Sequence, residues 1–326
     1  MRVRFLPGAQ EIILIKSIPM KFEQRMTQRL EQEQALKIRQ KLELKLDQKI
    51  GEFEKQVLEK VKFVDINLGD QPYHADMLGM LLVRESEDET SLLGSVVETQ
   101  GLSEKDIQEI IVETYQMKDV SFDIGTRRNV DIVTIILEDG TEFSMTVSLD
   151  KEAYKSPLDS PTYKEHETLK DQENSNVPAF QKLYGHTNSE DGGGFRSLIC
   201  KEYIPGTMLE NITHEIDGLM EGDEGVVSLE NQRSVADATG RMIGATLRET
   251  GGIPSDSNGF NIIINDSEED PAHPYSARYC DTEELRIEEK GIVHELRLLK
   301  SDFKSLETEF LKAVRAEWPN SILDTL

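Results

Sequence analysis

The chain has 326 residues, of which 62 are acidic and 37 basic, so its formal net charge at pH 7 is −25. A surface this acidic repels nucleic-acid backbones and anionic membranes, which argues against nucleic acid as a partner except through a local basic patch. The composition, 37% hydrophobic and 30% charged, allows a real core in one large domain or two modest ones.

Cysteine and hydropathy patterns indicate the compartment. Cys200 and Cys280 are too few for a disulfide framework and lack the spacing of metal ligands, so we expect a reducing, cytoplasmic location. No run has the length of a membrane span, and the apolar run 12–15 is too short for the core of a secretory signal. The six histidines are scattered and do not indicate a metal site.

Residues 21–62 contain no proline and one glycine, and are rich in Glu, Gln, Lys, Arg and Leu. Their apolar residues fall mostly at three- or four-residue steps, which predicts one or two long helices. A coiled coil, a helical hairpin and helices packed on their own domain all fit this pattern, and a helix that binds a partner is as compatible as one that does not. Residues 21–62 are therefore the candidate segment for oligomerisation.

A second helix is predicted over residues 102–116, with Ser103 as its cap and Ile107, Ile110, Ile111 and Tyr115 on its buried face.

From residue 120 onward the pattern changes to strands. Apolar, β-branched runs lie in 120–125 and on either side of Asp139-Gly140, a dipeptide typical of a tight hairpin turn. A short helix is expected over 163–172. The strings VPAFQKLYGH and FRSLICKEYIPG then predict two more strands, with the acidic, glycine-rich NSEDGGG between them.

The last third is predicted to be mainly helical. A long helix is expected from about Asn231 to Thr250, with Gly240 and Gly244 allowing a close neighbour. Short strands are expected at 261–264 and 275–280, and a helical region follows up to the tryptophan at 318.

The loop GGIPSDSNGFNIIIN, residues 251–265, offers a carboxylate, Asp256, and an amide, Asn261, at the mouth of a strand. An Asp followed five residues later by an Asn that opens a β-branched strand is similar to the catalytic loop of kinase-like phosphotransferases. Asp281 follows the next predicted strand. Each of the three also has an ordinary structural interpretation: Asp256 as a turn residue, Asn261 as a strand cap and Asp281 as a surface acid.

Further strings support the same resemblance. NVPAFQKLYGH is similar to the V-P-x-x-Y-G strand, LICKEYIPGTML to the fifth strand and hinge, and TGRMIGATLRETGGI to the helix before the catalytic loop, of aminoglycoside, choline and lipopolysaccharide-core kinases. The chain thus resembles the protein-kinase-like fold over residues 120–326. The resemblance implies an α+β, two-lobed fold: a small antiparallel-sheet lobe over 120–206 and a mainly helical lobe over 207–326, after a helical or mixed extension over 1–119.

The resemblance also implies cofactors and site residues. ATP and Mg²⁺ would be the cofactors, because phosphoryl transfer needs positioning and charge neutralisation by a cation held on oxygen ligands. Asp256 would accept the proton of the substrate hydroxyl, and Asn261 and Asp281 would hold the metal. Hinge backbone groups of Glu202, Tyr203 and Ile204 would bind the adenine edge. Glu165 or Glu167 on the short helix would pair with the phosphate-positioning lysine.

The chain departs from the family pattern at two places. Only Gly125 stands where a glycine-rich phosphate loop is expected, and residues 146–148, Thr-Val-Ser, stand where the third-strand lysine belongs. Lys151, Lys155 and Lys182 are the lysines nearest to that role. Two functions therefore remain open. One is an ATP- and Mg²⁺-dependent phosphotransferase acting on a hydroxyl of a small molecule, lipid-linked sugar or protein. The other is a catalytically inactive kinase-like interaction protein, a pseudokinase, whose N-terminal helices bind a partner. An acidic helical scaffold without ligand is a third reading.

Overall fold

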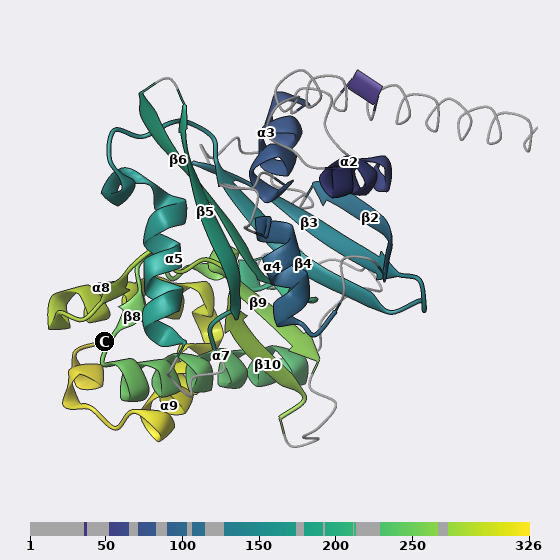
Figure 1. Ribbon diagram of the computed structural model, residues 1–326. Coiled ribbons are helices and arrows are strands. Elements are labelled where there is room, and N and C mark those ends of the chain that lie inside the picture. The colour runs from purple at the N-terminus through teal and green to yellow at the C-terminus, as the bar shows by residue number, and fades with distance from the viewer. Residues whose placement is uncertain are drawn as a thin grey trace, which may run out of the picture. The chain divides into compact units, whose positions relative to one another are not determined.

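The structure is a computed structural model of the chain (Figure 1). It describes residues 36–37, 52–64, 71–82, 90–102, 106–114, 127–173, 179–191, 193–210, 212, 229–266 and 273–326. Residues 12–15, most of 21–62, 120–125 with Gly125, and Val177-Pro178 lie outside the described residues, so the predictions made for them stay predictions. The fold is α+β, as predicted.

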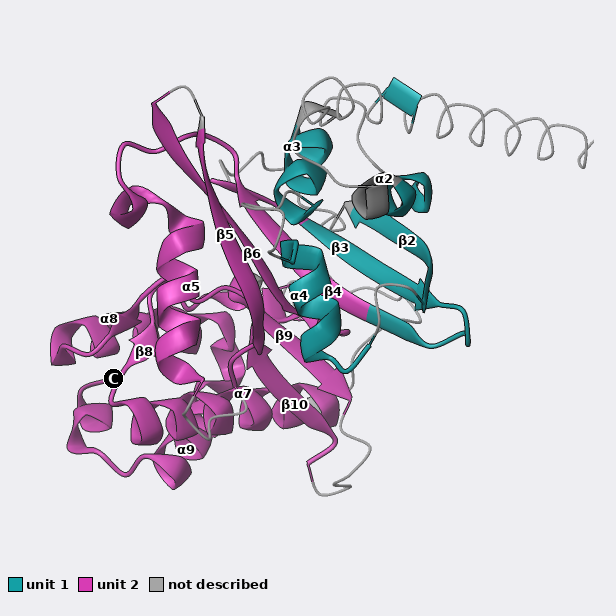
Figure 2. Cartoon of the chain, in the orientation of Figure 1, with its two compact units in different colours: residues 1–121, 131–143 teal, residues 122–130, 144–326 magenta. Residues whose placement is uncertain are grey.

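The chain divides into two compact units, coloured separately in Figure 2. Unit 1 comprises residues 1–121 and 131–143, and unit 2 comprises 122–130 and 144–326. Strands β3 (Arg128–Leu137) and β4 (Glu142–Asp150) each contribute residues to both units. The division predicted from the sequence, at residues 119 and 206, stays a prediction.

Unit 1 combines short helices with a small sheet. Its helices are α2 (Glu52–Glu59), α3 (Gln71–Leu82) and α4 (Leu92–Thr99), and its strands are β1 (Val61–Val64), β2 (Ile107–Thr114) and most of β3. Strand β1 pairs with β2 in parallel, and β2 pairs with β3 antiparallel. Ser91 caps α4 by accepting a hydrogen bond from the Gly94 N–H at 3.2 Å.

The helix predicted over 102–116 was wrong, because residues 107–114 form strand β2. Ile107, Ile110 and Ile111 fit helical spacing, but the run also contains Val112 and Thr114, and β-branched side chains favour a strand where partner strands exist. Here β1 and β3 supply those partners on either side. Likewise, the helix expected to reach Lys62 ends at Glu59, and Lys62 lies in β1.

The predicted hairpin at Asp139-Gly140 is confirmed. Strand β3 ends at Leu137 and β4 begins at Glu142. Gly140 has φ +82°, a conformation that costs glycine little, and the Asp139 carboxylate accepts a hydrogen bond from the Thr141 N–H at 2.8 Å.

The sheet part of unit 2 is built from β4, β5 (Leu183–Asp191) and β6 (Gly194–Glu202), in the order β4-β6-β5 with antiparallel pairing throughout. Helix α5 (Pro161–Gln172) connects β4 to β5 and packs on β5 and β6, as Figure 1 shows. Ser160 caps this helix, and its hydroxyl donates to the buried Asp150 carboxylate at 2.6 Å. The connection between β5 and β6 is shorter than the predicted NSEDGGG, because β5 continues to Asp191 and β6 begins at Gly194.

The helical part of unit 2 follows β7 (Thr207–Met208). Helix α7 (Leu229–Thr250) lies beside α9 (Glu307–Glu317) in Figure 1, and α8 (Glu289–Asp302) precedes α9. Strand β9 (Ile262–Asp266) pairs with β7 and with β10 (Tyr275–Tyr279), while β8 (Ile253–Pro254) pairs with β11 (Leu285–Arg286). The predicted helices 163–172 and 231–250 and the strands at 261–264 and 275–280 are confirmed within a few residues.

One apolar core holds this part of unit 2 together. It joins α7, α8 and α9 to β9 and β10, with Ile243, Ile262, Tyr279, Leu296 and Phe310 essentially inaccessible to solvent. The loops that follow β8 and β10 are thus mounted on a packed base. In the part of the chain that the structure describes, we find no helix with the length and apolar character to cross a membrane.

Candidate functional site

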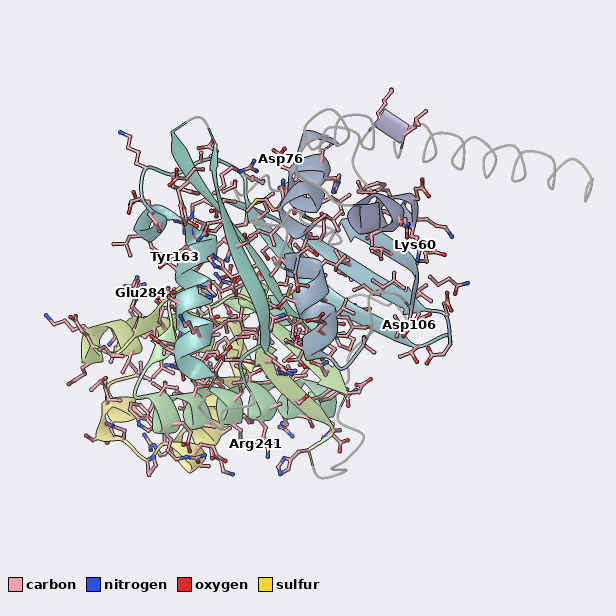
Figure 3. All side chains as sticks on the ribbon, viewed as in Figure 1. Lys60, Asp76, Asp106, Tyr163, Arg241 and Glu284 are labelled. Carbon is pink, nitrogen blue, oxygen red and sulfur yellow. The ribbon has the colours of Figure 1, made fainter. Side chains whose placement is uncertain are left out.

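A cleft of about 370 Å³ lies in unit 2, where the loops after β8 and β10 meet. It is lined by Arg127, Lys164, Ser255, Asp256, Asn261, Asp281, Glu283, Glu284 and Arg286. Glu284, labelled in Figure 3, is one of its exposed acidic residues, and Tyr163, also labelled there, belongs to α5, the helix that contributes Lys164. Three residues predicted from the sequence, Asp256, Asn261 and Asp281, therefore share one cleft.

The loop that carries Asp256 is closed by its own hydrogen bonds. The Asn261 Nδ2 donates to the main-chain carbonyl of Asp256 at 2.8 Å, and the Asn258 Nδ2 donates to the Asp256 Oδ1 at 2.8 Å. The Ser257 N–H donates to the buried Glu295 carboxylate on α8 at 3.0 Å, which anchors the loop to the core. Asp256 has φ +59°, a conformation that Asp tolerates better than most residues. The loop presents its exposed carboxylate in a fixed geometry.

Asp281 follows β10 and is held by a buried arginine. Its Oδ2 accepts a hydrogen bond from the Arg128 Nη2, while its Oδ1 is buried and has no hydrogen-bond partner among the described residues. Burial raises the pKa of Asp281, but the positive charges of Arg128 and Lys201 outweigh it and the net pKa is lowered. Asp281 is thus an ionised carboxylate that lines the cleft, and its Oδ1 is unpaired among the described residues.

A buried ion pair lies behind Asp281. The Lys201 Nζ on β6 donates to the Glu165 Oε1 on α5 at 2.7 Å, and the side chains are only 2% and 1% exposed. The Arg128 Nη1 donates to the Glu165 Oε2 at 2.6 Å. Burial lowers the pKa of Arg128, but the negative charges of Asp281 and Glu165 raise it by more, so the net pKa is raised. Glu165 is therefore bonded to two cations and does not line the cleft.

Further ion pairs lie at the edge of the cleft. The Arg127 Nη2 bonds the Glu283 carboxylate at 2.9 Å, and the Arg286 Nη1 lies 3.1 Å from the Glu284 Oε2. Burial and the nearby Asp281 raise the pKa of Glu283, although Arg128 opposes them. Positive and negative side chains thus both line the cleft.

The hinge-like residues 202–204 are not part of the cleft lining. Glu202 uses both main-chain groups within the protein: its N–H donates to the Lys182 carbonyl at 2.9 Å, and its carbonyl accepts from the Gln181 Nε2 at 2.7 Å. Ile204 is buried and Tyr203 half-buried. Gly206 has φ +147°, and a Cβ there would lie 2.5 Å from the Ile264 carbonyl oxygen, so the bend requires glycine.

The donor set suits a hard cation. Among the described residues no cluster of three or more His, Cys, Asp or Glu side chains forms a metal site. The cleft instead offers the unpartnered Asp281 Oδ1 and the amide oxygen of Asn261, whose nitrogen is already used. Mg²⁺ is commonly bound by one or two protein oxygens together with water and substrate phosphates, so these residues fit it.

No family model matches the chain, and no curated protein does. Many solved structures are similar to it. One of them is WaaP in complex with acyl carrier protein, at 15% sequence identity and a TM-score of 0.43, with 65% of this chain and 80% of that chain covered. A likeness this distant assigns no residue.

Sequence reasoning missed Lys201 and Arg128. Each has a local signal: Lys201 is the one cation in the run LICK, and Arg128 is the first residue of the apolar strand β3. A cation within a buried strand needs a buried anion, and that requirement points to Glu165.

Proposed function

We propose that this chain is an ATP- and Mg²⁺-dependent phosphotransferase of kinase-like fold that acts on a hydroxyl acceptor. The observation that carries the proposal is the convergence of Asp256, Asn261 and Asp281 on one cleft, although Asp281 lies 20 residues or more from the others in sequence. The order of elements in unit 2, from α5 through β5 and β6 to α7 and the loop after β8, agrees with the resemblance seen in the sequence.

Each residue has a defined part in this proposal. The exposed Asp256 carboxylate accepts the proton of the acceptor hydroxyl, and its loop geometry holds it in place without the ligand. The Asp281 Oδ1 and the Asn261 amide oxygen would hold the cation, which would neutralise charge on the phosphates. Because these groups come from two loops on one core, little reorganisation precedes transfer.

The adenine would lie against the hinge segment. Since both main-chain groups of Glu202 already have protein partners, Tyr203 and Ile204 are the hinge residues left for the adenine edge. The cations Arg127 and Lys164 line the cleft, where they can approach an anionic ligand.

The alternative is a kinase-like interaction protein without transfer activity. The observation that favours it is the hydrogen bond from Arg128 to the Asp281 Oδ2. The positive charge of Arg128 partly neutralises this carboxylate, which weakens its attraction for a metal ion. Under this alternative the cleft binds nucleotide weakly or not at all, and the partner-binding surface lies elsewhere.

The test measures Mg²⁺-dependent phosphate release from ATP, with water as acceptor, for the wild type and Asp256→Asn. Asparagine tolerates the φ of residue 256 and keeps an oxygen for Asn258, so the loop is preserved. We expect turnover to fall by about 100-fold or more while the affinity for ATP stays within about threefold. The control is Asp266→Asn, an exposed residue at the end of β9 outside the cleft. ATP binding without wild-type turnover would favour the interaction protein.

A further inference from the structure

Three consecutive residues around Asp281 are each held by one member of a buried cluster. The Lys201 Nζ donates to the Cys280 carbonyl at 3.0 Å, and Arg128 donates to the Asp281 carboxylate. The Thr282 N–H donates to the Glu165 Oε1 at 3.3 Å. We call Lys201, Glu165 and Arg128 the buried triad.

The triad members are bonded to one another and shielded from water. Glu165 accepts from Lys201 through one oxygen and from Arg128 through the other. Their side chains are 1–8% exposed. Burying two cations and a carboxylate is costly unless every member is paired, and here the pairing extends to the segment 280–282. An ion pair that only joined α5 to β6 would not need these three contacts on consecutive residues.

Lys201 lies on the strand next to the one on which the phosphate-positioning lysine was expected. Thr146 on β4 and Lys201 on β6 are direct partners in the antiparallel ladder. The side chains of directly opposed residues project from the same face of a sheet and lie next to each other. A lysine side chain at residue 146 or at residue 201 would therefore extend from nearly the same place on that face. Strand β4 is the strand on which the sequence led us to expect the lysine.

We propose that Lys201 is the positioning lysine of this site, moved from β4 to the neighbouring strand β6, and that with Glu165 and Arg128 it fixes Asp281 in the cleft. The role of Lys201 in nucleotide binding rests on the proposed function, but its effect on the geometry of the segment 280–282 can be tested without nucleotide. Lys201 acts through Glu165 and the Cys280 carbonyl, so it is a positioning residue.

The experiment uses the full chain and exchanges the two side chains. Lys201→Thr removes the ammonium group, while Glu165 keeps Arg128 as partner, so the buried carboxylate stays paired and the fold is expected to survive. The double variant Thr146→Lys/Lys201→Thr returns the ammonium group from β4. The matched control is Lys170→Thr, an exposed residue of α5. Two quantities are measured: hydrogen exchange of the Thr282 amide without ligand, and the Kd for ATP with Mg²⁺.

We expect Lys201→Thr to speed exchange of the Thr282 amide and to weaken ATP binding, each by about tenfold. The double variant should recover most of both effects, and Lys170→Thr should change neither. A folded Lys201→Thr with wild-type exchange and affinity overturns the proposal. So does a folded double variant that recovers neither quantity.

Other outcomes are also decisive. If the wild type binds no ATP, the proposed function fails and the exchange data alone decide the role of Lys201. If Lys201→Thr does not fold, the double variant decides: wild-type exchange and affinity support the transfer of the lysine between strands, and a folded double variant with a fast-exchanging Thr282 amide contradicts it.

Discussion

Arg278 on β10 binds both carboxylate oxygens of Glu202, the last residue of β6. The distances are 2.9 Å from Nη1 to Oε1 and 2.6 Å from Nη2 to Oε2, and Nη2 also donates to the Phe180 carbonyl at 2.8 Å. A bidentate pair of this kind fixes orientation as well as distance. It ties the start of the hinge segment to the strand that leads to Asp281.

Arg278→Ala should destabilise the chain by about 1–3 kcal/mol at pH 7, because it removes both charged hydrogen bonds from a half-buried carboxylate, which then keeps the Lys182 N–H bond at 3.1 Å. Burial raises the pKa of Glu202, but the hydrogen bonds from Arg278 outweigh it, so the net pKa is lowered. A lowered carboxyl pKa stabilises the fold above the ordinary value of 4.5, and this is lost as the pH falls. Urea unfolding at pH 7 and pH 4 should show the difference between variant and wild type shrinking. Arg315→Ala, in an exposed pair with Asp324, is the control.

Gly240→Ala should destabilise the chain although alanine favours a helix by about 1 kcal/mol over glycine. A Cβ at residue 240 would lie 2.5 Å from the Phe310 carbonyl oxygen and 2.7 Å from the Ala313 Cβ, so α7 and α9 must separate. We expect a net loss of about 1–2 kcal/mol by thermal or urea unfolding. A stabilised variant would contradict the close packing of these helices, and Ser234→Ala on the same helix provides a comparison.

His186 on β5 should make stability depend on pH. Its ring stacks on that of His166 with centroids 3.9 Å apart, and burial, then the neighbouring His166, lower its pKa to about 3. Below pH 6.5 His186 is therefore protonated in the unfolded state but stays neutral in the folded state until the pH approaches 3. Because the unfolded state binds the extra proton, the free energy of unfolding falls as the pH drops below 6.5.

The variant His186→Phe keeps an aromatic ring against His166 and Tyr163 but removes the titrating group. We expect its unfolding free energy to decline less than that of the wild type between pH 7 and pH 5. Equal slopes for the two proteins would show that His186 is not the responsible group. Denaturant unfolding at several pH values measures both slopes.

Local signals in the sequence predicted several elements of the fold. The Asp139-Gly140 turn, α5, α7 and the strand at Ile262 all follow from turn chemistry or periodicity. Strand β2 could not be recognised in this way, because Ile107, Ile110 and Ile111 fall at the three- and four-residue steps of a helix. Only the flanking strands β1 and β3 decide in favour of a strand.

The site was predictable in part for the same reason. Asp256 and Asn261 share one loop, so their spacing is visible in the sequence, and Asp281 follows the next strand. Lys201 and Arg128 join Glu165 from 36 and 37 residues away, and no local pattern encodes such distances. The lysine was expected on β4, and the ladder register that relates Thr146 to Lys201 exists only in the folded sheet.

The most direct test of a nucleotide site at this cleft is a calorimetric titration of ATP, with and without Mg²⁺, into the wild type and Asp281→Asn. The substitution keeps the shape of the side chain, and Arg128 retains Glu165 as its partner, so the fold should persist. We predict Mg²⁺-dependent binding to the wild type and a loss of that dependence in Asp281→Asn, with Asp266→Asn behaving as wild type. Equal binding to all three proteins, or no binding by the wild type at millimolar ATP, would contradict the phosphotransferase site.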